Sequence, residues 1–440
     1  MGRGWAFMPQ GKPGVFRLRN FWILLIGSSF SVMGDNAYFT ILGWFVLSVT
    51  GSQLALGTTM TFAAIPRIVF MLVGGAIADR VSRKLIMSIS LSLRAVVLFL
   101  FALRLVTGNA HPSLWMIETM ATLFGVIDSF YYPASGSVIQ AAVAEPFVPR
   151  ATSILQTVQQ SCTVLGPLLA AALLSMHHYG LMFVTIGAFF ACASLVVTAL
   201  RLRAVLPQGD AQKKRENTRT SSMLRDIREG LRYVVSIRLL LIVMSLSLCI
   251  NLLCTGPLNI GIPVLIRSRG WTGTTFGVYE AALGIGAVLG GVWVSALKGF
   301  RGRLLWIGAC GVVMGLLIAL LGYIPARVGG VLDMGGIGAA ISMVNIPFLA
   351  FLQEFVPGDK LGRTMSVFML VANGFTPISY SLSSWILQQR VPAPALLFGC
   401  GIGMSVVFSL LYGSREYRRI DSYTRATPAH EPDPAYPSEI

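Results

Sequence analysis

Four charged residues lie inside long apolar stretches of the chain: Asp35, Arg67, Arg94 and Asp128. Asp35 lies about 14 residues into its stretch, which is roughly 21 Å along an α-helix at 1.5 Å per residue. In a membrane, an ionised acid at that depth costs at least about 2.5–3.5 kcal/mol, so it must face a partner or a water-filled interior. We therefore expect Asp35 either to take up a proton or a cationic group, or to form a fixed ion pair with Arg67.

The two arginines and the two acids balance in charge. A network that is switched by protonation needs such a balance, because a proton added to either acid upsets it. A static, salt-bridged core needs the same four residues, so both interpretations stay open.

Three further acids lie near the outer ends of apolar stretches, and we expect them to be solvated: Glu118, Glu280 and Asp333. Glu280 is the exception that we keep as a candidate site residue, because it precedes the glycine-rich run 284–291.

The other reactive residue types give no sign of catalysis or metal binding. The six cysteines form no CxxC pair and all lie in apolar stretches, where they act as small packing residues. His177 and His178 have no cysteine or acid nearby. The sequence contains no G-x-x-x-x-G-K-[ST] phosphate loop and no nucleophile–base pair. We expect neither an enzyme nor a bound cofactor or metal.

The composition places these residues in a membrane protein. Of the 440 residues, 55% are hydrophobic and only 12% are charged, and the mean hydropathy is +0.71. Soluble domains carry roughly 25% charged residues, so a soluble enzyme or nucleic-acid binder is excluded. Apolar stretches of about 20 residues recur along the chain, as membrane-spanning helices require.

Twelve such segments predict an all-α integral membrane protein with two six-helix bundles. Their approximate ranges are 21–48, 54–78, 85–106, 113–143, 151–175, 181–200, 239–265, 275–297, 304–324, 328–355, 364–387 and 393–412. An amphipathic pattern in the basic central segment predicts an interfacial helix over 223–237. The predicted domains are a cytoplasmic N-terminal segment, the first bundle, the central loop, the second bundle and a disordered tail, at 1–20, 21–200, 201–238, 239–412 and 413–440.

The distribution of Lys and Arg predicts the orientation. With the N-terminus inside, 27 of the 34 basic residues lie on the inner face, and the outer loops carry only Arg267, Arg269, Arg327 and Arg390. Positive residues accumulate in cytoplasmic loops. This predicts a membrane protein with both termini in the cytoplasm. The net charge of +16 is thereby explained without a nucleic-acid partner.

The two halves also resemble each other. Gln140, Arg150 and Ser153 recur at the same spacing as Gln353, Arg363 and Ser366. Two six-helix repeats joined by a basic loop are typical of transporters whose substrate site lies near the bilayer midplane.

The stretch from Gly75 to Lys84 (GAIADRVSRK) resembles the loop motif G-x-x-x-D-R-x-G-R-K of the major facilitator superfamily, with Ser82 in place of the second glycine. The resemblance implies secondary transport by two rocking halves, without ATP hydrolysis. It also implies a conformational latch on the inner face, in which Asp79 approaches the start of the eleventh helix and Arg83 bridges Asp79 to Asp128. The latch residues are Gly75, Asp79, Arg80, Arg83 and Lys84. The alternative is that the basic residues serve as topology signals alone.

Shorter motifs resemble a bacterial exporter branch that includes macrolide-efflux and enterobactin-exporter proteins. They are Gly34-Asp35-Asn36-Ala37, Pro66-Arg67, Asp128-Ser129-Phe130 and the segment 226–233 (DIREGLRY). The resemblance implies proton-coupled export of amphipathic small molecules, with the proton gradient as energy source and membrane lipids as surroundings, and we expect a monomer. The alternatives are a lysophospholipid flippase, to which the GDNA stretch points, a siderophore exporter and, last, a membrane scaffold that has lost transport.

Overall fold

The computed structural model describes residues 15–78, 81–108, 112–143, 145–200, 231–296, 304–356 and 358–413. These residues form helices and short connections, without a strand. Helices satisfy every backbone hydrogen bond within one segment, which hydrocarbon surroundings demand. Nine helices or helical runs of the described part are long and apolar enough to cross a membrane. The prediction of an all-α membrane protein is confirmed.

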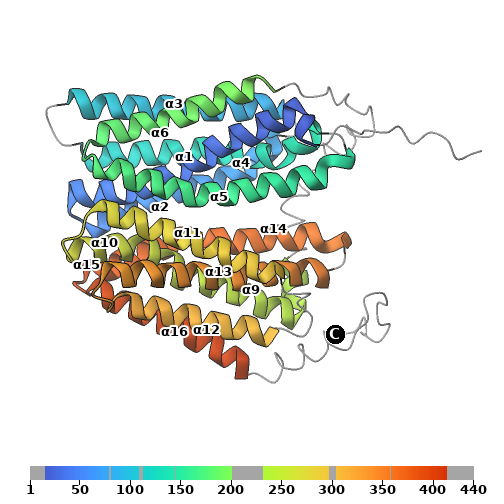
Figure 1. Ribbon diagram of the computed structural model, residues 1–440. Helices are drawn as coiled ribbons and strands as arrows, with labels where there is room; N and C mark the ends of the chain where they lie inside the picture. Colours follow the sequence, from blue (N-terminus) through green and yellow to red (C-terminus); the bar gives the residue numbers. More distant parts are fainter. Residues whose placement is uncertain are drawn as a thin grey trace, which may run out of the picture. The chain divides into compact units, whose positions relative to one another are not determined.

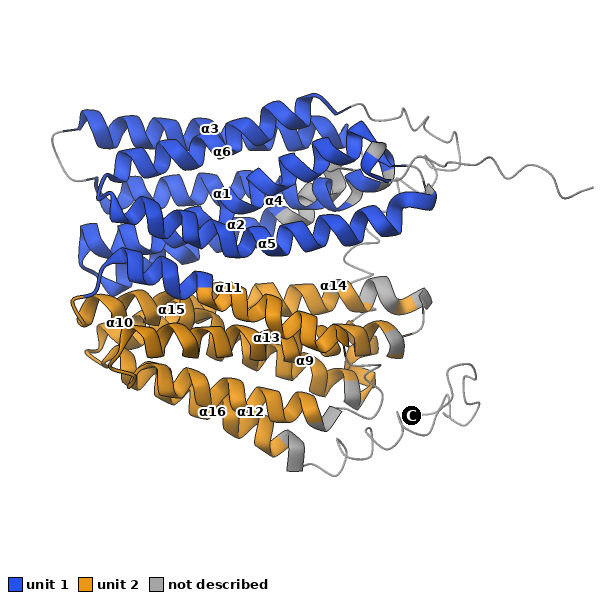
Figure 2. Ribbon diagram, viewed as in Figure 1, with its two compact units in different colours: residues 1–220, 271–281 blue, residues 221–270, 282–440 orange. Residues whose placement is uncertain are grey.

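The chain divides into two compact units (Figure 2). Unit 1 contains Met1–Thr220 together with Trp271–Ala281, and unit 2 contains Ser221–Gly270 and Ala282–Ile440. The helices of unit 1 are η1 (Val15–Arg17), α1 (Arg19–Thr50), α2 (Gln53–Ala78), α3 (Arg83–Thr107), α4 (Leu114–Ala142), η2 (Glu145–Phe147), α5 (Val148–Ser175) and α6 (Tyr179–Thr198).

Within unit 1, the helices that follow each other in the chain are not always those that pack together most closely. The most extensive contacts are those of α2 with α4, α3 with α6, and α1 with both α5 and α6 (Figure 1). Glycines permit the close approaches. A Cβ on Gly166 of α5 would lie 2.6 Å from the Cβ of Asn36 on α1.

Unit 2 contains the seventh to twelfth apolar segments of the chain, except for the first residues of the eighth. Its helices are α9 (Arg238–Ile250), η3 (Asn251–Thr255), η4 (Pro257–Gly261), α10 (Ile262–Ser268), α11 (Gly273–Ala296), α12 (Leu304–Leu321), α13 (Arg327–Phe355), α14 (Gly358–Gly374), α15 (Thr376–Gln388) and α16 (Ala393–Gly413). The first residues of α11 belong to unit 1 by contact, and the rest belong to unit 2.

Two predicted segments are not single α-helices. The seventh passes through two π-helical turns, η3 and η4, between α9 and α10. The eleventh is divided at Phe375 into α14 and α15, because Pro377 supplies no backbone N–H to the turn before it. Most of the predicted interfacial helix over 223–237 lies outside the described residues, although 231–236 are helical. The predicted disordered tail also lies outside them.

Candidate functional site

The four charged residues singled out above lie on four different helices of unit 1, each near the middle of its helix. Asp35 lies on α1, Arg67 on α2, Arg94 on α3 and Asp128 on α4. Each is separated from both ends of its helix by about three turns or more at 3.6 residues per turn. The sequence therefore brings four charges to one level of the bundle.

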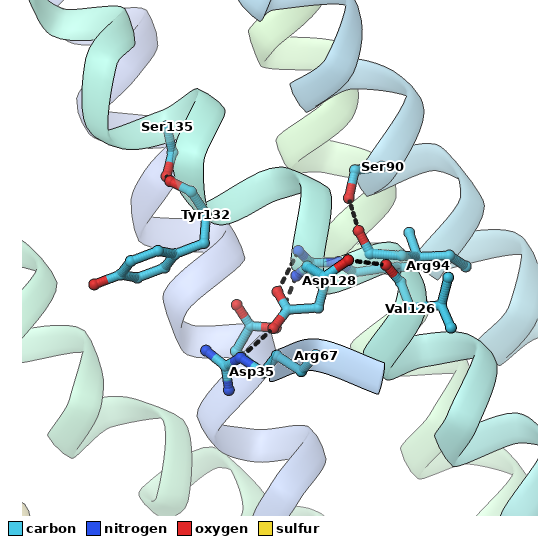
Figure 3. A network of polar contacts seen from close by, with 10 residues as sticks. Asp35, Arg67, Ser90, Arg94, Val126, Asp128, Tyr132 and Ser135 are labelled. Carbon is cyan, nitrogen blue, oxygen red and sulfur yellow. Dashed lines mark hydrogen bonds and ion pairs between the residues drawn. The ribbon is translucent and has the colours of Figure 1, made fainter. Parts of the chain in front are cut away.

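These residues form a continuous chain of ion pairs, here called the four-charge network (Figure 3). Arg94 Nη1 donates to Asp35 Oδ1 at 2.9 Å, and Arg94 Nη2 lies 2.5 Å from Asp128 Oδ1. Arg67 Nε lies 2.9 Å from Asp128 Oδ2. The order is thus Asp35, Arg94, Asp128, Arg67, with alternating sign and no net charge.

The two middle members of the network are buried, and the two end members are partly exposed. The side chains of Arg94 and Asp128 are 0% and 7% exposed, whereas those of Asp35 and Arg67 are 26% and 43% exposed. An exposed charge at mid-helix depth is tolerated in a membrane protein when it faces water or a bound ligand rather than lipid. The arrangement therefore joins two accessible charged ends through a buried guanidinium and a buried carboxylate.

Three aromatic rings surround the buried guanidinium. The Cζ atom of Arg94 lies 4.8 Å from the ring centroid of Tyr131 and 5.4 Å from those of Phe124 and Phe190. All three distances fall within the range of cation–π contact. We call these three rings the aromatic cage of Arg94, whose side chain is fully buried.

Local packing fixes the network. A Cβ on Gly34 would come within 3.1 Å of the Phe190 ring, and a Cβ on Gly125 would overlap the Ala63 carbonyl of α2. The hydroxyl of Ser90 on α3 donates to the Ile127 carbonyl on α4 at 2.8 Å. α4 is thereby tied to α2 and α3 within one turn of Asp128.

One expected pairing is wrong. Asp35 pairs with Arg94 and not with Arg67, because α1 makes few contacts with α2 in this bundle and Arg67 pairs with Asp128. Asp128 pairs with Arg67 and Arg94. The expected bridge of Arg83 from Asp79 to Asp128 stays a prediction, because Asp79 lies outside the described residues. Arg83 begins the same helix as Arg94, eleven residues earlier.

The latch motif is only partly within the described residues. Asp79 and Arg80 lie outside them, Gly75 is helical within α2, and Arg83 and Lys84 are the half-buried first residues of α3. Ser82, the residue that departs from the motif, caps α3, since its side chain accepts a hydrogen bond from the Leu85 N–H at 3.2 Å.

The expectation that three acids near the outer ends are solvated is wrong for two of them. Glu118 is 9% exposed and accepts a 2.6 Å hydrogen bond from Thr58 on α2. Asp333 is 7% exposed. Both turn inward because neighbouring helices cover the faces on which they lie. Glu280 is half-buried in α11, outside the four-charge network.

The aromatic cage was missed in the sequence, although a signal for it was present. Phe124, Asp128 and Tyr131 follow one another at spacings of four and three residues, so they share one face of α4. The described residues contain no group of three His, Cys, Asp or Glu side chains that would hold a metal ion.

A family model described as Major Facilitator Superfamily matches residues 24–378. The chain belongs to this superfamily. The resemblance in the loop motif is thus confirmed, and the protein is a multi-pass membrane transporter. This agrees with the absence of catalytic motifs in the sequence.

Curated relatives of this transporter include bacterial efflux proteins. It is 24% identical over 379 residues to macrolide efflux protein A of Streptococcus pyogenes, covering 83% of this chain and 88% of that protein. It is 22% identical to the multidrug efflux pump Tap of Mycolicibacterium fortuitum, covering 86% and 90%. The uncharacterized MFS-type transporter YfiS of Bacillus subtilis is 27% identical, with 80% and 83% covered.

Solved structures agree on the fold. The nucleoside transporter NupG superposes with a TM-score of 0.72 at 14% identity, over 90% of this chain and all of that one. A bacterial homologue of the iron transporter ferroportin, in its inward-facing state, has a TM-score of 0.66 at 14% identity, over 91% of this chain and all of that one. At such identities these likenesses concern the fold alone.

Proposed function

We propose that this transporter is a proton-coupled exporter of amphipathic small molecules of the drug or macrolide type. The names of two efflux relatives support the direction and the substrate class. The observation that carries the proposal is the open acidic end of the four-charge network: Asp35 is partly exposed at mid-helix depth, and its partner Arg94 is fully buried.

The network gives a physical route from protonation to motion. A proton on Asp35 removes one negative charge and leaves Arg94 paired with Asp128 alone. The cluster then carries a net positive charge inside a low-dielectric bundle, where unbalanced charge is costly. Protonation of Asp35 therefore changes the free-energy difference between two conformations of the bundle. Coupled transport requires such a change.

The sparse polar groups of unit 2 fit an apolar or amphipathic substrate. Asn251 and Asn259 are half-buried in the π-helical run or at its start, and each donates its side-chain N–H to a carbonyl one turn earlier on its own helix. Their amide oxygens stay available as acceptors. Sugars would need many more fixed polar partners than this.

The test is accumulation of ethidium and of a macrolide in a pump-deficient bacterium that expresses the chain, with and without a protonophore. We expect lower accumulation than with an empty vector, and loss of the difference with the protonophore or with Asp35→Asn. Asp35→Glu keeps the carboxyl and is expected to retain part of the export. Glu118→Gln, which changes a buried acid outside the network, serves as the matched control.

An outcome with no difference from the empty vector, at equal membrane expression, contradicts export of drugs. Lysophospholipids and siderophores would then be the substrates to assay. Export that persists unchanged in Asp35→Asn contradicts the assigned role of Asp35.

A further inference from the structure

One face of α5 is polar, although the helix is long and apolar enough to cross a membrane. Five exposed polar residues in the first half of the helix follow one another mostly at steps of three and four, so they share one face over about two turns. We call this surface the α5 polar face, and its members are Ser153, Gln156, Thr157, Gln160 and Ser161. None of them belongs to the four-charge network.

The α5 polar face does not fit a lipid environment. The exposed face of α3 carries large apolar side chains, as hydrocarbon surroundings favour: Leu93, Val96, Leu100 and Leu103. An exposed glutamine amide in hydrocarbon would lose its hydrogen bonds to water, which is costly. The exposed amides of α5 must therefore meet water or a bound molecule.

The α5 polar face extends toward the level of the four-charge network. α5 packs against α1, and Gly166 of α5 lies against the residue that follows Asp35 on α1. Cys162 interacts with Ser29 of α1, so the two helices run in the same direction. Ser161, the last member of the face, is five residues before Gly166, which is about 7.5 Å along the helix. A drug-sized molecule spans such a distance.

The hydrogen-bonding groups of the face define what it can bind. The hydroxyls of Ser153, Thr157 and Ser161 each donate to the carbonyl four residues earlier on α5, at 2.9–3.1 Å, and keep lone pairs as acceptors. The amide of Gln160 lies 3.5 Å from the Thr163 hydroxyl, a long contact that ties it weakly. The amide groups are thus open to a ligand.

The face is also uncharged. α5 carries no Asp, Glu, Lys or Arg over residues 151–175. Amides and hydroxyls without a neighbouring charge complement neutral groups that donate and accept hydrogen bonds, namely hydroxyls and carbonyls. An ionised group of a ligand would gain no ion pair there.

We propose that the α5 polar face binds the hydroxyl- and carbonyl-bearing side of the exported molecule. The inference rests on the proposed export of amphipathic molecules and names the part of the substrate that is recognised outside the four-charge network. A macrolide presents several hydroxyls and carbonyls, whereas ethidium, a flat aromatic cation, has neither. Gln156 and Gln160 are the specificity-determining residues, because each amide supplies two donors and an acceptor on the longest side chains of the face.

Ligand binding to the purified full-length protein tests the face without requiring transport. Equilibrium dialysis with radiolabelled erythromycin and with ethidium gives two Kd values for each variant. We expect Gln156→Ala and Gln160→Ala each to raise the Kd of erythromycin, relative to that of ethidium, by about 2- to 13-fold, which corresponds to one neutral hydrogen bond. The matched controls are Leu165→Ala and Leu168→Ala, which shorten exposed apolar residues of the same helix and should leave this ratio unchanged.

A second pair of variants separates the amide from the fold. Gln156→Asn and Gln160→Asn keep the amide on a shorter side chain, and we expect a smaller rise in the ratio than with alanine. They also decide the question if an alanine variant fails to fold.

Three outcomes overturn the proposal. The first is a ratio of Kd values that stays at its wild-type value in the glutamine variants, which would leave the face to water alone. The second is an equal rise in the leucine variants, and the third is a wild-type protein that does not bind erythromycin. A wild type that binds erythromycin through this face but does not lower its accumulation in cells contradicts the proposed export instead.

Discussion

At the scale of single residues, the two acids of the four-charge network stabilise the fold to different extents. Asp128→Ala leaves Arg67 and the fully buried Arg94 without their shared partner. Breaking a buried pair from one side costs about 3–5 kcal/mol, because an uncompensated charge stays behind. Asp35→Ala leaves the Arg94–Asp128 pair intact and removes a partly exposed acid. We expect a much larger fall in the thermal unfolding midpoint for Asp128→Ala. Equal falls would contradict the difference in burial between Asp128 and Asp35.

The same reasoning predicts that neutralising a pair harms less than neutralising one member. Arg67→Gln combined with Asp128→Asn removes one charge of each sign and leaves Arg94 paired with Asp35. The single variant Asp128→Asn leaves two positive charges facing one negative charge. We expect the double variant to unfold at a higher temperature than Asp128→Asn, with a coupling energy of about 0.5–3 kcal/mol from the double-mutant cycle. Additive shifts would mean that the 2.9 Å pair contributes nothing.

The identities of the network residues were predictable, but their partners were not. Charge inside apolar stretches is visible in the sequence, and it singled out Asp35, Arg67, Arg94 and Asp128. The pairing depends on the rotation of each helix and on which helices touch. These are tertiary properties, and chain neighbours such as α1 and α2 turn out to be poor guides. The burial of Asp333 was misjudged for a similar reason, because position along a helix does not reveal the face on which a residue lies.

At the scale of helices, a single glycine sets the distance between the two that carry Arg67 and Asp128. Gly125 lies three residues before Asp128, and a Cβ there would overlap the Ala63 carbonyl. Gly125→Val should push α4 away from α2 and stretch the Arg67–Asp128 pair, with an overpacking cost of about 1–3 kcal/mol. We expect a lower unfolding midpoint and reduced export. Gly136→Ala on the same helix is the control, because nothing lies within 4 Å of its Cβ position. Similar losses in both variants would show that α4 resists any added side chain.

The π-helical run of unit 2 depends on one serine of α15. Ser379 accepts the Gly256 N–H at 2.8 Å and donates to the Leu252 carbonyl at 2.7 Å. Ser379→Ala leaves the Gly256 N–H without its partner, at a cost of about 1–3 kcal/mol. Ser384→Ala is the matched control, since among the described residues that buried hydroxyl donates to the Ser381 carbonyl of its own helix. We expect a fall in the unfolding midpoint for Ser379→Ala alone. A comparable fall for Ser384→Ala would indicate general sensitivity of α15.

Helix positions were predictable from hydropathy to within a few residues, but interruptions were not. The segment 239–265 is one apolar run in the sequence. Its π-helical turns are not marked there, because such turns need no polar residue to form. Its widened turns are stabilised by a hydroxyl more than 120 residues away in the chain. Such a partner leaves no local signal. The break at Phe375 did have one, in Gly374 and Pro377.

At the scale of the whole molecule, the number of apolar segments and the distribution of basic residues jointly specify one orientation. Membrane insertion places Lys and Arg of short loops on the cytoplasmic side, and the sequence carries 27 such residues on one face against four on the other. We therefore predict both termini in the cytoplasm. A green fluorescent protein fused after Gly413 should fluoresce, and alkaline phosphatase fused there should be inactive. Phosphatase fused at His178, between α5 and α6, should be active. The reverse pattern would contradict this orientation and would invert every helix relative to the membrane.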